Sequence, residues 1–283
     1  MNRPSQYRNV RTPLSPMAAV SATAGLLSVA VDPAEATKGE EGDSLQNGKP
    51  TVVLVHGAFA DSSSWNDVIK QLKRHGYPVV AAANPLRGLT GDAAHIKSLL
   101  ASIAGPVVLV GHSYGGAVIT NAAHGSDQVK ALVYIAAFIP DKDESADDLA
   151  KRFPGSSLAD ALRPVPCTLP DGSPGVDLYI DQDRFHHQFA ADVHPYTTNL
   201  MAATQRPVTV AALEEASGEP AWKTIPSWSL VAGEDLNIPR EAQMFMARRA
   251  ESHMVVIHSS HAASVSHPGD VADIIERAAR SVR

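Results

Sequence analysis

The residues with the clearest chemical meaning lie in the stretch Gly111-His112-Ser113-Tyr114-Gly115. It stands between an uninterrupted apolar run, Val107–Val110, and a segment with the composition of a helix, 117–123. A buried strand, a sharp turn and a helix in this order place the Ser113 hydroxyl at the apex of a strained elbow, above the end of the strand. Such a serine is typical of a catalytic nucleophile. The alternative is a glycine-rich turn with an incidental serine.

A serine hydroxyl needs a neighbouring base to take its proton, and the chain has 12 histidines. In folds with such an elbow, the histidine lies on the loop after the last strand. His261 follows the apolar run 254–257 directly, so we predict that it is the base. His258 is still in the strand register, His267 precedes a proline, and His253 precedes the strand.

An acid should follow the preceding strand, where it would hold the imidazole in the correct tautomer. The run 227–232 leads into Glu234 and Asp235, and position favours Asp235. The alternative is an acid that only caps the next helix. Asp141 and Asp143, after an earlier strand, are rival candidates.

A fourth element should stabilise the negative charge that develops on a substrate oxygen. The apolar run 51–55 leads into His56-Gly57-Ala58, and the backbone N–H groups of Ala58 and Tyr114 are the predicted oxyanion donors. We expect His56 to be a buried histidine that ties this loop down by hydrogen bonds. The candidate apolar walls of a substrate pocket are Phe59, Phe138 and Trp222.

Composition narrows the class of partner. The chain has 283 residues, 44% of them hydrophobic, and a formal net charge of −6. No basic stripe is visible, which argues against nucleic acid and favours a small-molecule substrate. The single cysteine, Cys167, stands in a proline-rich stretch without metal-ligand spacing, and we expect neither a metal nor an organic cofactor. Composition does not indicate an oligomeric state.

The first fifty residues differ from the rest of the chain. Residues 1–36 combine three arginines, a short apolar run at 17–31 and an Ala-x-Ala site, which is typical of a secretory signal. The run is too short for a membrane span, which needs about 20 apolar residues. Residues 37–49 are polar and predict a flexible linker before a domain at 50–283. We therefore expect a secreted or periplasmic protein; the alternative is a cytoplasmic one with a disordered extension.

Strands and helices alternate along most of this domain, which predicts a mainly parallel, doubly wound α/β sheet. The expected strands are 51–55, 79–83, 107–110, 129–135, 227–232 and 254–257, and the expected helices cover 61–76, 92–104, 117–123, 239–250 and 268–282. The alternation is interrupted at about 140–222, where short amphipathic pieces such as 145–152 and 181–191 predict an inserted helical cap.

His-Gly-Ala-Phe, Gly-His-Ser-Tyr-Gly-Gly, Gly-Glu-Asp and Ser-His-Ala occur in this order from about residue 51 onward. This pattern resembles the α/β-hydrolase superfamily, and most closely a compact bacterial branch related to plant methyl-ester esterases and hydroxynitrile lyases. The resemblance implies an α/β-hydrolase fold with a small helical cap. It also implies that Ser113, Asp235 and His261 form a catalytic triad, with Ala58 and Tyr114 as oxyanion donors.

Departures from the family pattern bear on the reaction. Hydroxynitrile lyases of this group carry threonine at the position of Gly57 and lysine at the position of Ala262. Without that lysine no cation receives cyanide, so a lyase is not favoured. Many relatives also have aspartate at the position of Asn84. Because this position lies outside the triad, the difference leaves the predicted chemistry unchanged and weakens only the comparison with the substrates of those relatives.

The predicted function is a serine hydrolase that cleaves carboxylic esters, or related activated acyl compounds, through an acyl-enzyme. Two alternatives stay open, because fold does not fix function. One is a non-hydrolytic ligand-binding or receptor protein. The other is a cofactor-free perhydrolase or C–C hydrolase that uses the same residues.

Overall fold

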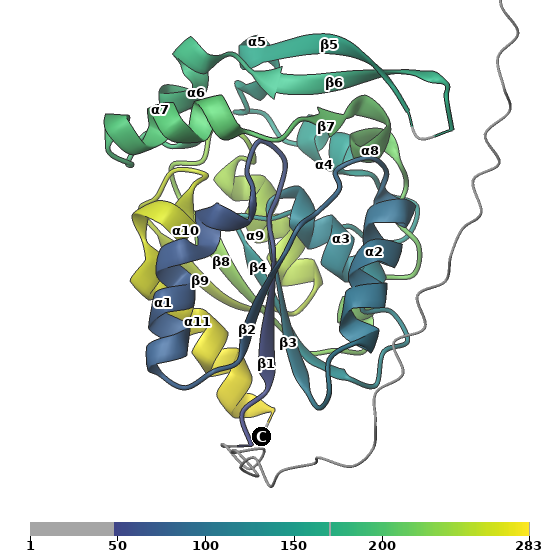
Figure 1. Ribbon diagram of the computed structural model, residues 1–283, viewed down its shortest axis with the longest axis vertical. Coiled ribbons are helices and arrows are strands. Elements are labelled where there is room, and N and C mark those ends of the chain that lie inside the picture. The colour runs from purple at the N-terminus through teal and green to yellow at the C-terminus, as the bar shows by residue number, and fades with distance from the viewer. Residues whose placement is uncertain (1–47, 170, 283) are drawn as a thin grey trace, which may run out of the picture. The chain divides into compact units, whose positions relative to one another are not determined.

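A computed structural model describes residues 48–169 and 171–282. The predicted secretory signal and all but the last two residues of the predicted linker lie outside the described residues. The main sheet has six strands in the order β2-β1-β3-β4-β8-β9, and each neighbouring pair is parallel (Figure 1). The predicted doubly wound α/β architecture is therefore confirmed.

Apart from a short helix at 263–266, which was not predicted, the elements of this sheet layer lie close to their predicted positions. The strands are β1 (Thr51–Val55), β2 (Val79–Ala82), β3 (Val107–His112), β4 (Val129–Ile135), β8 (Ser227–Ala232) and β9 (His253–Ile257). The helices are η1 (Ser62–Trp65), α1 (Asn66–Arg74), α2 (Leu89–Ala101), α3 (Tyr114–Ala122), α9 (Arg240–Arg249), α10 (Ala263–Ser266) and α11 (Pro268–Ser281). Helix α2 was expected to begin at Asp92 but begins three residues earlier, at Leu89. Gly88 is its N-cap residue, and Asp92 lies within its first turn.

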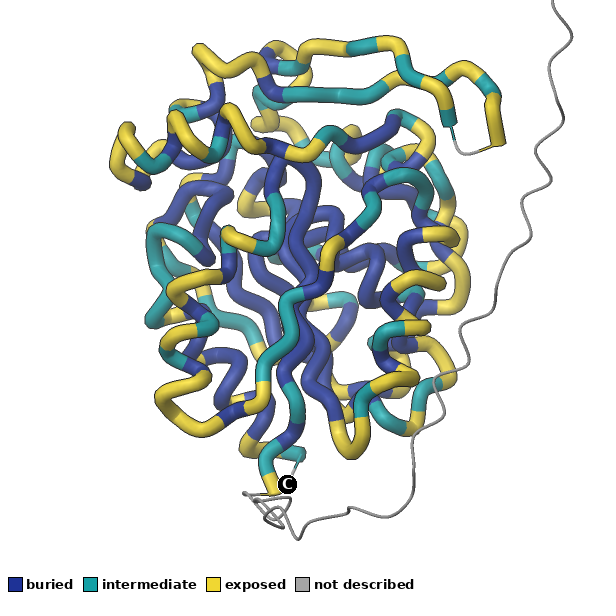
Figure 2. The backbone as a smooth tube through the Cα atoms, in the orientation of Figure 1, coloured by how far each residue is buried: buried dark blue, intermediate teal, exposed yellow. Residues whose placement is uncertain are grey.

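Alternate residues of each strand enter two separate cores. Val53 and Leu109 pack with α2, α3 and α9 on one face of the sheet. Val52 and Val108 pack with α1 and α11 on the other face. Because both faces of the sheet are covered, its strands are mostly apolar, as is usual in parallel sheets; the exceptions include Lys130 in β4 and Ser229 in β8. Figure 2 shows the buried strands enclosed by helices whose outer sides are exposed.

The segment between β4 and β8 forms the cap above the carboxyl ends of the strands, except for its last residues, which return to the amino end of β8 (Figure 1). It contains α4 (Ala146–Arg152), α5 (Leu158–Ala161), β5 (Leu162–Thr168), β6 (Pro174–Ile180), α6 (Gln182–Phe189), α7 (Pro195–Thr204), β7 (Val208–Thr209), α8 (Val210–Glu214) and η2 (Ala221–Lys223). Helices α4 and α6 match the two predicted amphipathic pieces. The antiparallel sheet β5-β6-β7 was not predicted, because Pro164 and Pro166 break the strand pattern; β5 accepts them as an edge strand.

Strand register brings the functional loops together. Val55 at the end of β1 lies beside Gly111 in β3, and Ala232 at the end of β8 lies beside Ile257 in β9. The turns that follow β1 and β3 are therefore neighbours, and so are the turns that follow β8 and β9. These four turns carry every residue predicted to do chemistry.

Glycines let the elbow helix α3 approach the sheet. A β-carbon on Gly111 would lie 2.5 Å from the carbonyl oxygen of Gly115, and one on Gly115 would lie 2.6 Å from that of Val55. At Gly116 it would lie 2.7 Å from the β-carbon of Ala137, and closer still to the carbonyl oxygen of Phe138. Real β-carbons do not tolerate these distances, so larger residues would force the backbone apart.

Gly116→Ala should destabilise the protein by about 1–3 kcal/mol or more, because the added methyl group overpacks the contact between α3 and the end of β4. Gly91→Ala is the matched control, since Gly91 lies in α2 with nothing within 4 Å of an added β-carbon. It should be neutral or stabilising by up to about 1 kcal/mol. Urea unfolding of both variants tests this, and equal midpoints would contradict the packing argument.

Candidate active site

Ser113 lies at the turn between β3 and α3 in a strained conformation, with φ 54° and ψ −125°. A non-glycine residue at positive φ costs on the order of 1–3 kcal/mol and persists only where its surroundings hold it. Here the Ser113 amide donates to the carbonyl of Ile135 (3.2 Å), and the Ser113 carbonyl accepts from the amides of Gly116 (2.9 Å) and Phe138 (3.1 Å). The backbone on both sides of the hydroxyl is thus held by neighbouring elements.

The turn after β1 lies directly against this elbow. A β-carbon on Gly57 would be 2.5 Å from the β-carbon of Ser113, so a larger residue here would require the turn or the elbow to move. Ala58 follows, and Tyr114 is the first residue of α3. Within the described part of the chain, neither amide donates a hydrogen bond to another protein group. Both predicted oxyanion donors are therefore available beside Ser113, and the helix dipole of α3 favours negative charge there.

Asp235 and His261 form a buried pair. The distance between Asp235 Oδ2 and His261 Nδ1 is 2.6 Å, and the side chains are 0% and 1% exposed. Oδ1 of Asp235 accepts from the amides of Asn237 (2.7 Å) and Ile238 (3.0 Å), and Oδ2 accepts from Gln243 Nε2 (2.8 Å). Because the Asp235 carboxylate accepts these hydrogen bonds, His261 Nδ1 is the donor in the bond between the two side chains. Nδ1 therefore carries the ring proton, and Nε2 is left as a base.

Ser113 and His261 line one cavity of about 410 Å³, together with Ala58 and Tyr114. No hydrogen bond joins Ser113 Oγ to the His261 ring among the described residues; catalytic contacts of this kind are commonly long without substrate. The structure thus brings the predicted nucleophile, base, acid and oxyanion donors to one place.

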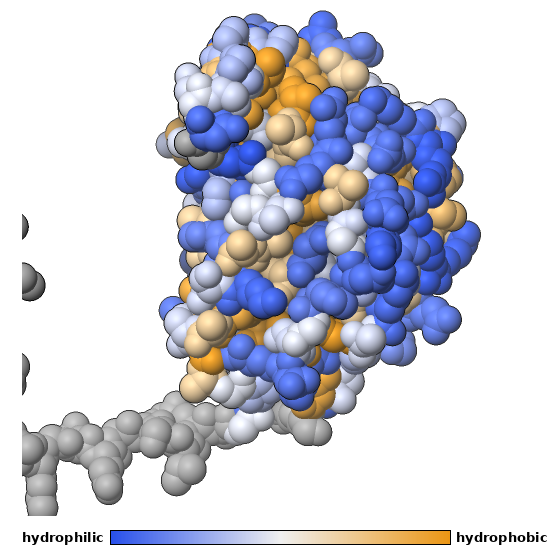
Figure 3. All heavy atoms as spheres, turned by 90° about the vertical axis from the view of Figure 1, so that its right-hand side faces the viewer, coloured by the Kyte–Doolittle hydropathy of each residue, from blue (hydrophilic) through white to orange (hydrophobic). Residues whose placement is uncertain are grey.

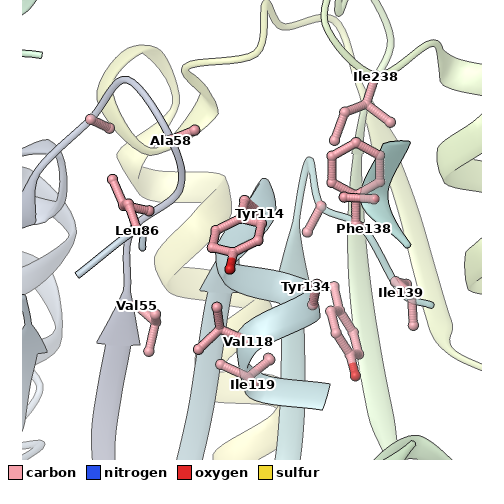
Figure 4. Packing of buried hydrophobic residues seen from close by; sticks show 14 of the residues in the cluster. Val55, Ala58, Leu86, Tyr114, Val118, Ile119, Tyr134, Phe138, Ile139 and Ile238 are labelled. Carbon is pink, nitrogen blue, oxygen red and sulfur yellow. The ribbon is translucent and has the colours of Figure 1, made fainter. Parts of the chain in front are cut away.

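Phe59 and Phe138 line this cavity as predicted, and most of its remaining wall comes from the cap. In Figure 4, Phe138 and Ile238 lie against one another beside the elbow. The larger apolar side chains among the further lining residues are Phe153, Leu158, Leu162, Leu178, Val210, Leu213 and Ile238. Sequence analysis missed them because nothing in the local pattern distinguishes a pocket wall from ordinary core.

The prediction that Trp222 lines the pocket is corrected by the structure. Trp222 lies in η2 and borders a different surface cavity, with Arg249 and His253. Its indole N–H donates to the carbonyl of Pro140 (2.9 Å), and the Arg249 guanidinium lies over its ring at 5.9 Å. These contacts hold the side chain away from the Ser113 cavity.

The histidines and acids that were set aside lie elsewhere. His258 is exposed and pairs with Glu234 at 3.4 Å, and His253 is the first residue of β9. Asp141 is bound by Lys223 at 2.7 Å, and Asp143 is exposed. None of these acids occupies the place beside His261 that Asp235 fills.

His56 ties down the β1 turn, as expected. Its Nδ1 donates to the carbonyl of Gly57 (2.9 Å), and its Nε2 accepts from the amide of Asn84 (3.0 Å). The Asn84 side chain returns a hydrogen bond to the carbonyl of His56 (3.0 Å). Burial lowers the pKa of His56, so it stays neutral.

Two further buried groups near the elbow were not predicted. His112 is 1% exposed, and its Nε2 donates to the carbonyl of His261 (2.9 Å). Burial, with the neighbouring His261, holds the pKa of His112 well below its usual range. Asp92 in α2 accepts from the Tyr114 hydroxyl (2.9 Å), and burial raises the pKa of this carboxyl. The hydrogen bond anchors the Tyr114 side chain in the core.

Residues 48–169 and 171–282 contain no group of three or more His, Cys, Asp or Glu side chains that could hold a metal ion. In the same residues, no helix is both long enough and apolar enough to cross a membrane.

Several curated proteins are similar to this chain. An alpha/beta hydrolase of Aspergillus novofumigatus, nvfD, is 24% identical over 253 residues, covering 82% of this chain and 97% of the relative. Methylesterase 2 of Arabidopsis thaliana is 24% identical over 233 residues, covering 75% of this chain and 89% of the relative. A carbendazim hydrolyzing esterase of Nocardioides is 35% identical over 106 residues, covering 33% of this chain and 44% of the relative.

Solved structures share the fold. A pyrethroid hydrolase from Sphingobium faniae has a TM-score of 0.67 at 22% identity, covering 82% of this chain and 98% of the other. Polyneuridine aldehyde esterase has a TM-score of 0.71 at 19% identity, covering 81% of this chain and 98% of the other. The model of the alpha/beta hydrolase family matches residues 52–274, which include every candidate site residue. The chain therefore belongs to the alpha/beta hydrolase family.

Proposed function

We propose that this protein is a serine esterase that hydrolyses uncharged, hydrophobic carboxylic esters through an acyl-enzyme on Ser113. The observation that carries the proposal is the meeting of Ser113, the Asp235–His261 pair and two available amides in one apolar cavity. Relatives named esterase, methylesterase and pyrethroid hydrolase support the same reaction class.

In the proposed reaction, His261 Nε2 takes the proton from Ser113 Oγ while the oxygen attacks the ester carbonyl carbon. The carbonyl oxygen becomes an oxyanion between the amides of Ala58 and Tyr114. When the tetrahedral intermediate collapses, the C–O bond to the alcohol breaks, and the imidazolium protonates the departing alcohol. Water, deprotonated by His261, then attacks the carbonyl carbon of the acyl-enzyme and forms a second tetrahedral intermediate. When this intermediate collapses, the bond to Ser113 Oγ breaks, His261 returns the proton to Ser113, and the acid is released.

Asp235 supports both steps. Its hydrogen bond to Nδ1 keeps Nε2 free to accept a proton, and its charge stabilises the imidazolium that forms. The amides of Asn237 and Ile238 and the Gln243 side chain donate hydrogen bonds to this buried carboxylate and fix its orientation toward His261.

The cavity wall favours hydrophobic substrates. Leucines of the cap line the cavity, and the charged lining residues are Asp147, Lys151 and Glu214. Lys151 is already paired with Asp147, so no free cation is offered to an anionic substrate. Figure 3 shows hydrophobic side chains gathered at the level of the cap, on the face that lies to the right in Figure 1. Ala262, next to His261, is buried and supplies no charge for lyase chemistry.

Ser113→Ala should lower kcat for p-nitrophenyl esters by roughly 10⁶-fold, because the nucleophile is removed. The measurement is release of p-nitrophenol from acetate, butyrate and octanoate esters. A fluorophosphonate should label the wild type at Ser113 and leave the variant unlabelled. Equal activity in the two proteins would overturn the proposal, and a folded wild type that neither turns over esters nor takes the label would favour a binding protein.

Asp235→Asn should lower kcat by about 10⁴-fold with little change in KM, because an amide no longer fixes the reactive tautomer of His261. Glu234→Gln is the matched control: the adjacent acid is exposed and pairs with His258, so activity should be unchanged. If the two variants were equally impaired, Asp235 would have no special role in catalysis.

Leu213→Asp should lower kcat/KM for the octanoate ester about tenfold, since a partly buried leucine contact is replaced by a charge in the cavity wall. The acetate ester should be much less affected. Leu200→Asp is the control, because this exposed leucine of α7 lies outside the Ser113 cavity. A parallel loss for both esters would argue against this wall as the acyl site.

A further inference from the structure

We propose that Asp192, in the cap loop between α6 and α7, is a positioning residue for the catalytic histidine and acts by clamping Ser260. This inference rests on the proposed function, since it concerns the same base, His261. Asp192 neither faces the cavity nor touches the reacting groups. It reaches the loop that carries them from a segment 68 residues earlier in the chain.

The clamp consists of two hydrogen bonds to one residue. The Ser260 amide donates to Asp192 Oδ2 at 3.1 Å, and the Ser260 hydroxyl donates to Asp192 Oδ1. Ser260 Oγ in turn accepts from the amide of Ala262 at 3.3 Å. The backbone on both sides of His261 is therefore tied to a single carboxylate of the cap.

The imidazole ring is held by neighbours from two other segments. Phe189, at the end of α6, meets the His261 ring edge-on, with centroids 5.0 Å apart and planes at 77°. His112, on the elbow strand, lies 4.7 Å from the same ring and donates to the His261 carbonyl. With Asp235 on Nδ1, the ring has supports from the sheet, the elbow and the cap.

Asp192 is suited to this work because Ser260 presents two donors. A carboxylate has an acceptor oxygen for each, whereas an amide side chain has only one. Burial opposes the charged form of Asp192, but the hydrogen bonds from Ser260 outweigh it, and the pKa of Asp192 lies below its usual range. His267, before α11, lies 3.5 Å from Oδ2 and joins the same carboxylate to the start of the last helix.

A base that is free to shift by a fraction of an ångström loses rate without losing substrate affinity, and a displacement of 1 Å can cost about 100-fold. Asp192→Ala should therefore lower kcat for p-nitrophenyl acetate by about 10- to 100-fold with KM little changed. Asp192→Asn should recover part of that loss. In a Ser260→Ala background, Asp192→Ala should have a smaller effect, because one of the two hydrogen bonds is already gone.

The matched control is Asp181→Ala, at the other end of α6. Asp181 caps this helix by accepting from the Asp183 amide (3.0 Å) and makes no contact with the histidine loop. It should reduce the melting temperature without reducing kcat of the folded protein. Equal loss of kcat in Asp181→Ala and Asp192→Ala would overturn the proposal, since a weakened cap would then explain both.

A second readout separates this proposal from the choice of substrate. The Nδ1 proton of His261, shared with Asp235, should give a strongly deshielded NMR resonance that Asp235→Asn removes. Asp192→Ala should shift or broaden that resonance, and Asp181→Ala should leave it in place. If wild type hydrolyses no ester but this pattern holds, the proposed function fails and the positioning role stands. An unchanged resonance in Asp192→Ala overturns the positioning role.

Discussion

The turn after β1 lies against the elbow at two glycines that leave no room for a β-carbon of their own, and the site depends on this contact. Gly57 faces the β-carbon of Ser113, and Gly115 faces the carbonyl oxygens of Val55 and His56. Since β1 and β3 are adjacent and end at the same level, the contact brings the Ala58 amide to the nucleophile. Glycine loses more conformational entropy on folding than other residues, so the fold gives up some stability for this geometry.

Buried polar groups around the elbow make the arrangement rigid. His56, His112, Asp92 and Asp235 are each at most 5% exposed, and each forms hydrogen bonds with backbone or side chains of another segment. Burying such groups is costly unless they are paired, so their partners favour one arrangement of the loops over any other. The strained φ of Ser113 can persist because hydrogen bonds with Ile135, Gly116 and Phe138 hold its backbone in place.

The sheet and the candidate chemistry could be predicted because both depend on local pattern and chain order. Apolar runs such as Val107–Val110 identify buried strands, and the carboxyl ends of parallel strands must share one edge, so loops after consecutive strands converge. Asp235 and His261 were placed by chain order, as the acid and the histidine that follow the last two strands in folds with such an elbow, and the structure brings them together. The α/β-hydrolase resemblance rested on the same motifs and is confirmed.

The cap was harder to predict, because its structure depends on contacts between distant segments. Pro164 and Pro166 are unusual in a strand, so β5 could not be recognised from the sequence; it is the edge strand of the small sheet, where prolines are tolerated. Trp222 was assigned to the pocket by residue type, but its indole donates a hydrogen bond to Pro140, and the side chain lines a different cavity. The contact of Asp192 with Ser260 joins segments for which the sequence offers no shared signal.

The cap has two parts, one in contact with the substrate cavity and the other in contact with the histidine loop. The part formed by α4, α5, β5, β6 and α8 lines the cavity, so its leucines face whatever enters. The carboxyl end of α6 and the loop after it instead contact the histidine loop through Phe189 and Asp192 and lie outside the cavity wall. Side chains of the first part can change the shape and polarity of the pocket without touching the supports of His261. The second part has less freedom, since a change there reaches the base directly.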